Sequence, residues 1–207
     1  RVKFQNRIYM ITRESIDPKS IVVIGGSKDI IKPGGKVLKN LIDGNFKGEL
    51  MVGNPKEDEV QGIKSYRDPK DIPDVELAII AIAAKYTPDT VKLLTEEKGT
   101  KAIIIISAGF SEESEEGKKL EEQLVEQCNK YNCALIGPNC TGVLTPNYHG
   151  VFTLPIPKLH IKGASLVSGS GATACFIMEA GIQAGLSFSS VFTVGNSAQM
   201  GIEEIVK

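Results

Sequence analysis

Residues 21–28 read Ile-Val-Val-Ile-Gly-Gly-Ser-Lys, and this stretch decides the fold. Four apolar β-branched residues without polar alternation are typical of a strand buried on both faces, as in a parallel sheet. The paired glycines end that strand and let the backbone approach a ligand closely. Residues 34–41 then show a helical pattern, with Pro33 near the first turn, where proline is favoured. A strand, a glycine turn and a helix in this order predict an α/β unit.

The same rhythm continues along the chain. Further buried strands are predicted at 49–52, 77–83, 102–106 and 133–136, and helices at 88–98 and from Ser111 onward. This alternation predicts a parallel sheet with right-handed crossovers and helices on both faces. Ligands on such sheets bind outside the carboxyl ends of the strands, so the strand ends offer the candidate binding loops.

The pattern changes after Thr145. Three prolines, Pro146, Pro155 and Pro157, interrupt any regular structure and predict a linker over 146–161. A second unit follows at 162–207, with strands at 164–167 and 188–194 around a helix at 172–184, and another helix from Ile202. Two strands and one helix cannot bury a doubly wound core, so this unit is predicted to be truncated or to lean on something absent. The predicted organisation is an extension at 1–14, a first domain at 15–145, the linker and an incomplete second domain.

The composition is that of an ordinary soluble protein, with 42% hydrophobic and 24% charged residues. A net charge of -1 gives no indication of nucleic-acid binding. No apolar run reaches the ~20 residues needed to cross a bilayer, and residues 1–9 lack the apolar core of a signal peptide. Met10 is a candidate natural initiator. The cysteines suit neither a disulfide framework nor a metal site, which favours the cytoplasm: Cys128, Cys133, Cys140 and Cys175.

The first loops have a structural and a functional interpretation. Gly26, Ser27 and Lys28 form either a tight turn with solvated lysines or an anion site at a helix N-terminus. The dinucleotide pattern GxGxxG is absent, and Asn54-Pro55 supplies no acid for a ribose, which disfavours NAD. The small residues at the third and fourth strand ends leave room for a ligand or serve close packing: Ala83, Ala84, Ser107, Ala108 and Gly109.

The most specific string is Gly-Pro-Asn-Cys-Thr-Gly-Val at 137–143. No histidine pairs with Cys140 in a recognisable pattern, so a wall-lining role is favoured over a nucleophilic one. The string Ser-Gly-Ser-Gly at 168–171 opens a helix, and it is either a serine cap or a phosphoryl cradle. His149 and His160 lack metal-ligand spacing and are interpreted as surface or linker residues.

Taken in order, these strings resemble the ADP-forming acetyl-CoA synthetases, relatives of the succinyl-CoA synthetase α subunit. The strings are Ser-Ile-Val-Val-Ile-Gly-Gly-Ser at 20–27, Gly-Asn-Pro at 53–55, Ser-Ala-Gly-Phe-Ser-Glu at 107–112, and those at 137–143 and 168–171. The resemblance covers nearly all of 15–207. It implies an α/β fold in which a Rossmann-like CoA-binding domain precedes the start of a flavodoxin-like domain.

The resemblance also implies a role for each candidate loop. CoA phosphates would meet Gly26, Ser27 and Lys28, with Lys36 adding charge, and the adenosine end would lie near Asn54 and Pro55. The pantetheine path would be lined by Ala83, Ala84, Ser107, Ala108 and Gly109, and the thiol would lie near Asn139 and Cys140. Phosphate would bind at Ser168, Gly169, Ser170 and Gly171.

The family reaction converts acyl-CoA, ADP and phosphate reversibly into a small carboxylic acid, CoA and ATP. The resemblance implies a phosphohistidine, its supporting glutamate and an ATP-grasp domain or subunit outside this chain. The chain is therefore predicted to bind CoA but not to turn over alone. ADP or ATP and Mg²⁺ would belong to the complete enzyme, which is expected to be an oligomer. Two alternatives stay open: a stand-alone CoA-binding or CoA-sensing module, and an NAD(P)-binding domain.

Overall fold

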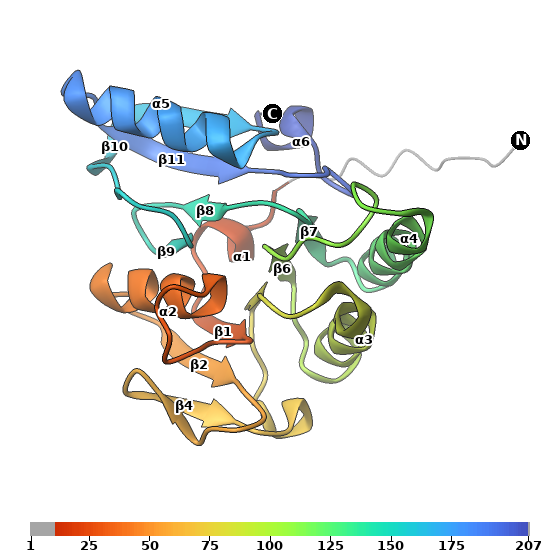
Figure 1. The fold of residues 1–207 in the computed structure, drawn as a ribbon. Coiled ribbons are helices and arrows are strands. Elements are labelled where there is room, and N and C mark those ends of the chain that lie inside the picture. The colour runs from red at the N-terminus through yellow and green to blue at the C-terminus, as the bar shows by residue number, and fades with distance from the viewer. Residues whose placement is uncertain (1–10, 207) are drawn as a thin grey trace, which may run out of the picture.

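A computed structural model describes residues 11–206. They form two sheets with helices around them, and the smaller sheet lies above the larger one in the view of Figure 1. The larger sheet has seven strands and the smaller has four. The predicted α/β class is therefore confirmed. Residues 1–10, with the candidate initiator Met10 and most of the predicted extension, lie outside the described part of the chain.

The larger sheet has the order β3-β4-β2-β1-β5-β6-β7. Every neighbouring pair is parallel except β3–β4. From β4 to β7 this is the doubly wound order, in which the direction of winding reverses at the first strand. Its strands are β1 (Ser20–Ile24), β2 (Glu49–Gly53), β3 (Glu59–Val60), β4 (Ile63–Tyr66), β5 (Leu77–Ile80), β6 (Ala102–Ile105) and β7 (Ala134–Ile136).

Helices cover both faces of this sheet (Figure 1). Helix α2 (Pro33–Asp43) lies on one face, while α3 (Thr87–Glu97) and α4 (Glu115–Lys130) lie side by side on the other. Successive residues of β1 enter opposite cores: Val23 packs in the α2 core and Val22 in the α3–α4 core. This explains why the strand carries no polar alternation, since both of its faces are buried. Three short helical segments complete the unit: α1 (Arg13–Ile16) and the 3₁₀ turns Pro69–Asp71 and Ala84–Tyr86.

The acidic helix begins later than the sequence predicts. Its N-cap is Ser114, whose Oγ accepts a hydrogen bond from the N–H of Gly117 at 3.0 Å, so the helix starts at Glu115. Ser111, where the sequence predicts that the helix begins, lies before it, and its hydroxyl donates to Oε2 of Glu121 at 2.8 Å. A tight turn at 110–114 stands between the strand end and the helix.

The smaller sheet has the order β10-β11-β8-β9. Strands β10 (Leu159–Ser168) and β11 (Phe188–Thr193) are parallel, and α5 (Gly171–Gln183) covers one of their faces. Strand β11 then pairs antiparallel with β8 (Gly142–Leu144), which pairs with β9 (His149–Val151). The second unit also contains α6 (Ile202–Val206).

The smaller sheet includes part of the segment 146–161, which the sequence predicts to be a linker. Residues 149–151 form β9, and β10 already begins at Leu159. Pro146 lies between β8 and β9, and Pro155 and Pro157 lie between β9 and β10, so each proline is compatible with strand formation on both sides. Strands β8 and β9 extend the sheet of the second unit, and its truncation stays a prediction. The domain boundaries at 145 and 162 remain a prediction, because these two strands join residues from both units.

Candidate functional site

The carboxyl ends of β1, β2, β5, β6 and β7 meet along one edge of the larger sheet, because these strands are parallel neighbours. We call this the carboxyl edge. The loops that leave it carry the candidate residues at 26–28, 54–55, 83–84, 107–109 and 139–140. The structure thus brings together five stretches that are far apart in the sequence. In doubly wound sheets this edge is where ligands bind.

A cleft of about 440 Å³ opens between the loops after β1 and β2, and we call it the β1–β2 cleft. Five predicted residues line it: Gly26, Ser27, Lys28, Asn54 and Pro55. The Asn54 amide ties the two loops together, because its Nδ2 donates to the carbonyl oxygen of Gly26 at 2.8 Å. Its Oδ1 accepts from the N–H of Lys56 at 2.9 Å. Asn54 therefore shapes the cleft as well as lining it.

The cleft has a small excess of positive charge. Three lysines line it, Lys28, Lys32 and Lys56, against the carboxylates of Asp29 and Glu57. Lys28 Nζ lies 2.7 Å from Oε2 of Glu57, and 60% of the Lys28 side chain is exposed, so the lysine can turn toward an anion. The lining does not include the predicted Lys36, which lies half-buried on α2 one turn further on. Lys32, the N-cap of α2, lines the cleft instead, because it precedes the helix at the mouth of the cleft.

The N-terminus of α2 lies directly against the loop that lines the cleft. Gly25 has φ +86°, a conformation that favours glycine, and a Cβ at Gly34 would overlap the Gly25 carbonyl. A Cβ at Gly35 would likewise overlap the carbonyl of Asp29. This close approach puts the positive end of the helix dipole beside the cleft. Gly25 before the loop and Gly34 after it are thus both needed for the close contact between loop and helix.

Gln61 is a supporting residue that the sequence analysis missed. Its Nε2 donates to the carbonyl oxygens of Ser27 at 2.8 Å and Gly35 at 2.9 Å. It lies in the turn between β3 and β4, at φ +53°. These strands have two and four residues, too short for a periodic signal, so only the dipeptide Gln61-Gly62 indicated a turn.

The loops after β5, β6 and β7 touch one another along the edge. A Cβ at Gly109 would lie 3.2 Å from the Cβ of Ala84, and Gly109 has φ +103°. The carbonyl oxygen of Ser107 accepts a hydrogen bond from the N–H of Asn139 at 2.9 Å. Asn139 is exposed at φ +59°, in the left-handed region that asparagine tolerates better than most residues. The small residues predicted for a ligand path therefore form one continuous strip.

The structure does not support the predicted wall-lining role of the Cys140 side chain. Its Sγ donates to the Ile105 carbonyl at 3.3 Å inside the α2 core, with 3% of the residue exposed. Burial raises the pKa of this thiol to about 12, so it is protonated at neutral pH, which does not suit a nucleophile. The side chain does not line the ligand path, although its backbone lies at the edge.

The 168–171 turn caps α5, as one of its two interpretations predicts, while the phosphoryl cradle stays a prediction. Ser170 is the N-cap of α5, with its Oγ accepting from the N–H of Thr173 at 3.2 Å. The Ser168 hydroxyl lies within the turn, donating to the Ser170 carbonyl at 2.9 Å. The first residue of α5, Gly171, is so close to Thr141 that a Cβ would overlap its methyl group. The helix N-terminus, which attracts anions, is therefore placed beside the 139–141 loop.

Thr193 at the end of β11 and Gly195 just after it also join the two units, and both were missed by the sequence analysis. The hydroxyl of Thr193 accepts from the N–H groups of Thr141 at 2.9 Å and Gly142 at 3.0 Å. Gly195 lies against the carbonyls of Pro138 and Asn139, where a Cβ would overlap both. The available signal was the Gly195-Asn196 pair at a strand end, the same kind of turn that follows β2.

Neither histidine reaches this region. A Cβ at Gly44, which ends α2, would lie 2.5 Å from Nδ1 of His149, so this imidazole packs at the amino side of the sheet. Burial lowers the pKa of His149, which favours the neutral ring. His160 is exposed near the start of β10, roughly 25 Å of strand before Ser168. Within residues 11–206, no group of three His, Cys, Asp or Glu side chains could hold a metal ion.

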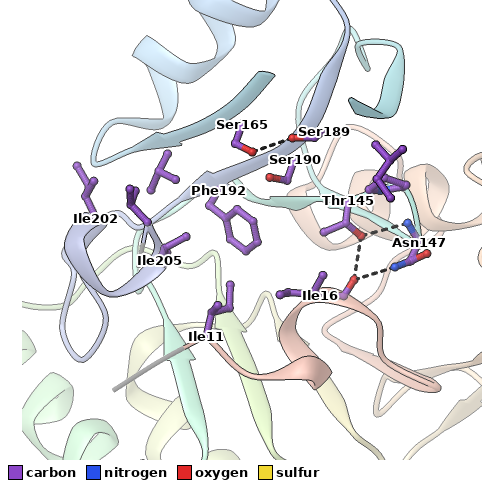
Figure 2. Close-up of a pocket in the computed structure, with 14 residues that line it drawn as sticks. Ile11, Ile16, Thr145, Asn147, Ser165, Ser189, Ser190, Phe192, Ile202 and Ile205 are labelled. Atoms are coloured by element: carbon purple, nitrogen blue, oxygen red, sulfur yellow. Dashed lines mark hydrogen bonds between the residues drawn. The ribbon is translucent and has the colours of Figure 1, made fainter. Parts of the chain in front are cut away.

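A larger cavity of about 600 Å³ lies between α1 and the smaller sheet (Figure 2). Isoleucine, valine and phenylalanine dominate its lining, with serines from the neighbouring strands β10 and β11, and the Ser165 and Ser189 hydroxyls are hydrogen-bonded to each other at 2.7 Å on that wall. Its lining includes no charged residue and none of the predicted ligand residues, so it does not suit a phosphorylated ligand. In the described part of the chain, no helix has the length and apolarity required to cross a bilayer.

Comparisons with known proteins identify the family and the fold. Residues 19–146, more than half of the chain, match the CoA binding domain family. The chain is 38% identical over 193 residues to the Pyrococcus furiosus protein named Acetate--CoA ligase [ADP-forming] II subunit alpha, with 92% of this chain and 41% of that protein covered.

Two solved structures share the fold over nearly the whole chain. PH0766 from Pyrococcus horikoshii OT3 superposes with a TM-score of 0.85 at 39% identity, over 94% of this chain and 44% of that one. The Ca. Korarchaeum cryptofilum dinucleotide forming acetyl-coenzyme A synthetase 1, in complex with phosphate and ADP, gives 0.85 at 28% identity, over 93% and 41%. The chain thus spans less than half the length of each of these relatives. It belongs to the CoA binding domain family, in the form carried by the ADP-forming acetyl-CoA synthetases, which are related to the succinyl-CoA synthetase α subunit.

Proposed function

We propose that this chain is the CoA-binding portion of an ADP-forming acyl-CoA ligase that acts on a small carboxylic acid such as acetate. The observation that carries the proposal is the contact between Gly171 and Thr141. It joins a helix N-terminus suited to a phosphoryl group to the end of a strip suited to pantetheine. A module that only stored or sensed CoA would need the strip but not the helix N-terminus suited to a phosphoryl group.

In this proposal CoA lies along the carboxyl edge. Its phosphates occupy the β1–β2 cleft, where the α2 N-terminus and Lys28, Lys32 and Lys56 neutralise their charge. The pantetheine arm crosses the small residues at 83–84 and 107–109, and the thiol reaches Asn139. The side chain of Cys140 takes no part. The absence of an acid directly after β2 continues to disfavour a dinucleotide.

The turn at 168–171 binds the phosphoryl group that passes between acid and nucleotide. Phosphoryl transfer depends mainly on positioning and charge neutralisation, and a helix N-terminus supplies both without a mobile side chain. The chain offers no histidine near this turn, so the phosphohistidine, ADP and Mg²⁺ belong to other parts of the enzyme, including an ATP-grasp domain or subunit. The cysteines, which are all free, suit a reducing cytoplasm.

Calorimetric titration with CoA and NADH tests the binding part of this proposal. CoA should bind and NADH should not, while NADH binding without CoA binding would refute the assignment. The catalytic part is tested with the complete enzyme encoded by the gene, by ATP formation from acetyl-CoA, ADP and phosphate. Ser170→Ala should lower its kcat, because the α5 cap is lost. Ser187→Ala, in the loop before β11, is the matched control and should retain full activity.

A further inference from the structure

One side chain of the second unit reaches the ligand loops of the first. Asn196 follows β11, and its Oδ1 accepts a hydrogen bond from Nδ2 of Asn139 at 3.2 Å. Its Nδ2 donates to the Glu112 carboxylate and lies 2.9 Å from Oε2 of Glu121 and 3.3 Å from Oγ of Ser111. The Asn196 amide therefore joins the loop after β6 to the loop after β7.

The Glu112 carboxylate extends this contact to the backbone of the predicted ligand path. Its Oε1 accepts from the N–H of Gly109 at 2.6 Å and from that of Phe110 at 3.2 Å. Burial alone would raise the pKa of Glu112, but the hydrogen bonds from Asn196 and these N–H groups together outweigh it and lower the pKa. The carboxylate is thus charged at neutral pH and holds Gly109 in place.

The backbone around Asn196 is itself fixed to the first unit. The N–H of Asn196 donates to the Pro138 carbonyl at 3.0 Å, and the N–H of Ala198 donates to the Gly137 carbonyl at 3.2 Å. Gly195 fits against the same segment because it has no side chain. The position of the Asn196 amide is therefore set by main-chain contacts on both sides.

We propose that Asn196 is a positioning residue that makes the thiol end of the CoA path depend on the second unit. This inference rests on the proposed function. Asn196 acts on Gly109 through Glu112 and on Asn139 directly. The β1–β2 cleft, where the nucleotide half of CoA binds, has a separate set of lining residues. Losing the Asn196 side chain should therefore weaken the hold on pantetheine and leave the hold on the nucleotide unchanged.

The chemistry of the contact requires an amide. Asn196 donates to Glu112 and Glu121 and accepts from Asn139, which only a side chain with both functions can do. Aspartate at this position would have no donor and would add a third carboxylate beside the other two. Asn196→Asp should therefore be more harmful than Asn196→Ala, although it is closer in shape.

The test compares CoA with its nucleotide half, 3′-phospho-ADP, by calorimetric titration of the purified chain. Asn196→Ala should bind CoA about tenfold more weakly, as expected for hydrogen bonds to a charged group, and Asn196→Asp more weakly still. Both should bind 3′-phospho-ADP like the wild type. Ser197→Ala is the matched control, because its hydroxyl bond stays in its own loop, to Gly195 O at 3.5 Å. Glu112→Gln should show the pattern of Asn196→Ala and covers the case in which Asn196→Asp does not fold.

Unchanged CoA affinity in Asn196→Ala and Glu112→Gln would overturn this role while leaving the proposed function intact. An equal loss for both ligands would also overturn it, since it would reflect a general loss of structure. A wild-type chain that binds neither ligand would refute the proposed function, and the role of Asn196 with it.

Discussion

Gly171 begins helix α5 at a distance from Thr141 that leaves no room for a β-carbon. Gly171→Ala should therefore lower the free energy of unfolding by about 1–3 kcal/mol, the usual range for overpacking. Adding Thr141→Ser should restore most of it, because serine lacks the methyl group but keeps the hydroxyl that lies 3.0 Å from the Thr193 hydroxyl.

Urea denaturation of the two single variants and the double variant measures this coupling. Gly169→Ala is the control, because a Cβ there meets no atom within 4 Å. If the double variant is no more stable than Gly171→Ala, then the contact between helix and loop is not the cause of the loss.

The ion pair between Lys28 and Glu57 limits the positive charge of the β1–β2 cleft. Glu57→Gln should release the lysine and tighten CoA binding about two- to fivefold at low salt, in line with the modest strength of exposed ion pairs. The gain should shrink as ionic strength rises, because salt screens exposed charges. Titration calorimetry at two salt concentrations measures both effects.

Glu59→Gln makes the same change in net charge on β3, outside the cleft lining, and should leave CoA affinity unchanged. Equal gains in the two variants would point to net charge rather than to the pair with Lys28.

Gln61 supports the loop after β1 without itself lining the β1–β2 cleft. Gln61→Ala removes its hydrogen bonds to the Ser27 and Gly35 carbonyls, so the free energy of unfolding should fall by about 1–3 kcal/mol. CoA affinity should fall as well, because the loop loses its fixed shape. Denaturation and titration of the same sample check the two effects. The control is Gln123→Ala, at an exposed position on α4. If Gln61→Ala had the same stability and CoA affinity as this control, the supporting role would be ruled out.

The buried thiol of Cys140 should make the free energy of unfolding depend on pH in the alkaline range. Its pKa is raised from 9.0 to about 12 in the folded chain, so above about pH 9 the unfolded chain releases a proton that the folded chain retains. Stability should therefore be constant from neutral pH to about 9 and then fall, with this thiol contributing up to about 1.4 kcal/mol per pH unit. Cys140→Ser should fall less steeply in urea denaturation between about pH 9 and 11, and an identical slope would contradict the assignment. Tyr148, whose pKa burial also raises, accounts for part of the remaining slope.

The sequence was sufficient for β1, β2, β5, β6 and β7 of the larger sheet, because these strands are mostly apolar runs, each closed by a glycine or a small residue. It was insufficient where short strands depend on tertiary partners. Residues 149–151 form a strand through pairing with β8, a contact that no local pattern encodes. The candidate site, too, could be predicted only in part. Loops at strand ends were predictable, whereas Gln61 and Asn196 act through hydrogen bonds to distant carbonyls and carboxylates, which spacing in the sequence does not reveal.

The central claim is that CoA lies along the carboxyl edge with its thiol beside the second unit. A crystal structure of the chain with CoA tests it most directly. The diphosphate should lie against Gly26 and Lys28, and the sulfur should lie next to Asn139 and the N-terminus of α5. Coenzyme found in the apolar cavity of Figure 2, or with its pantetheine arm directed away from the 107–109 loop, would contradict the account.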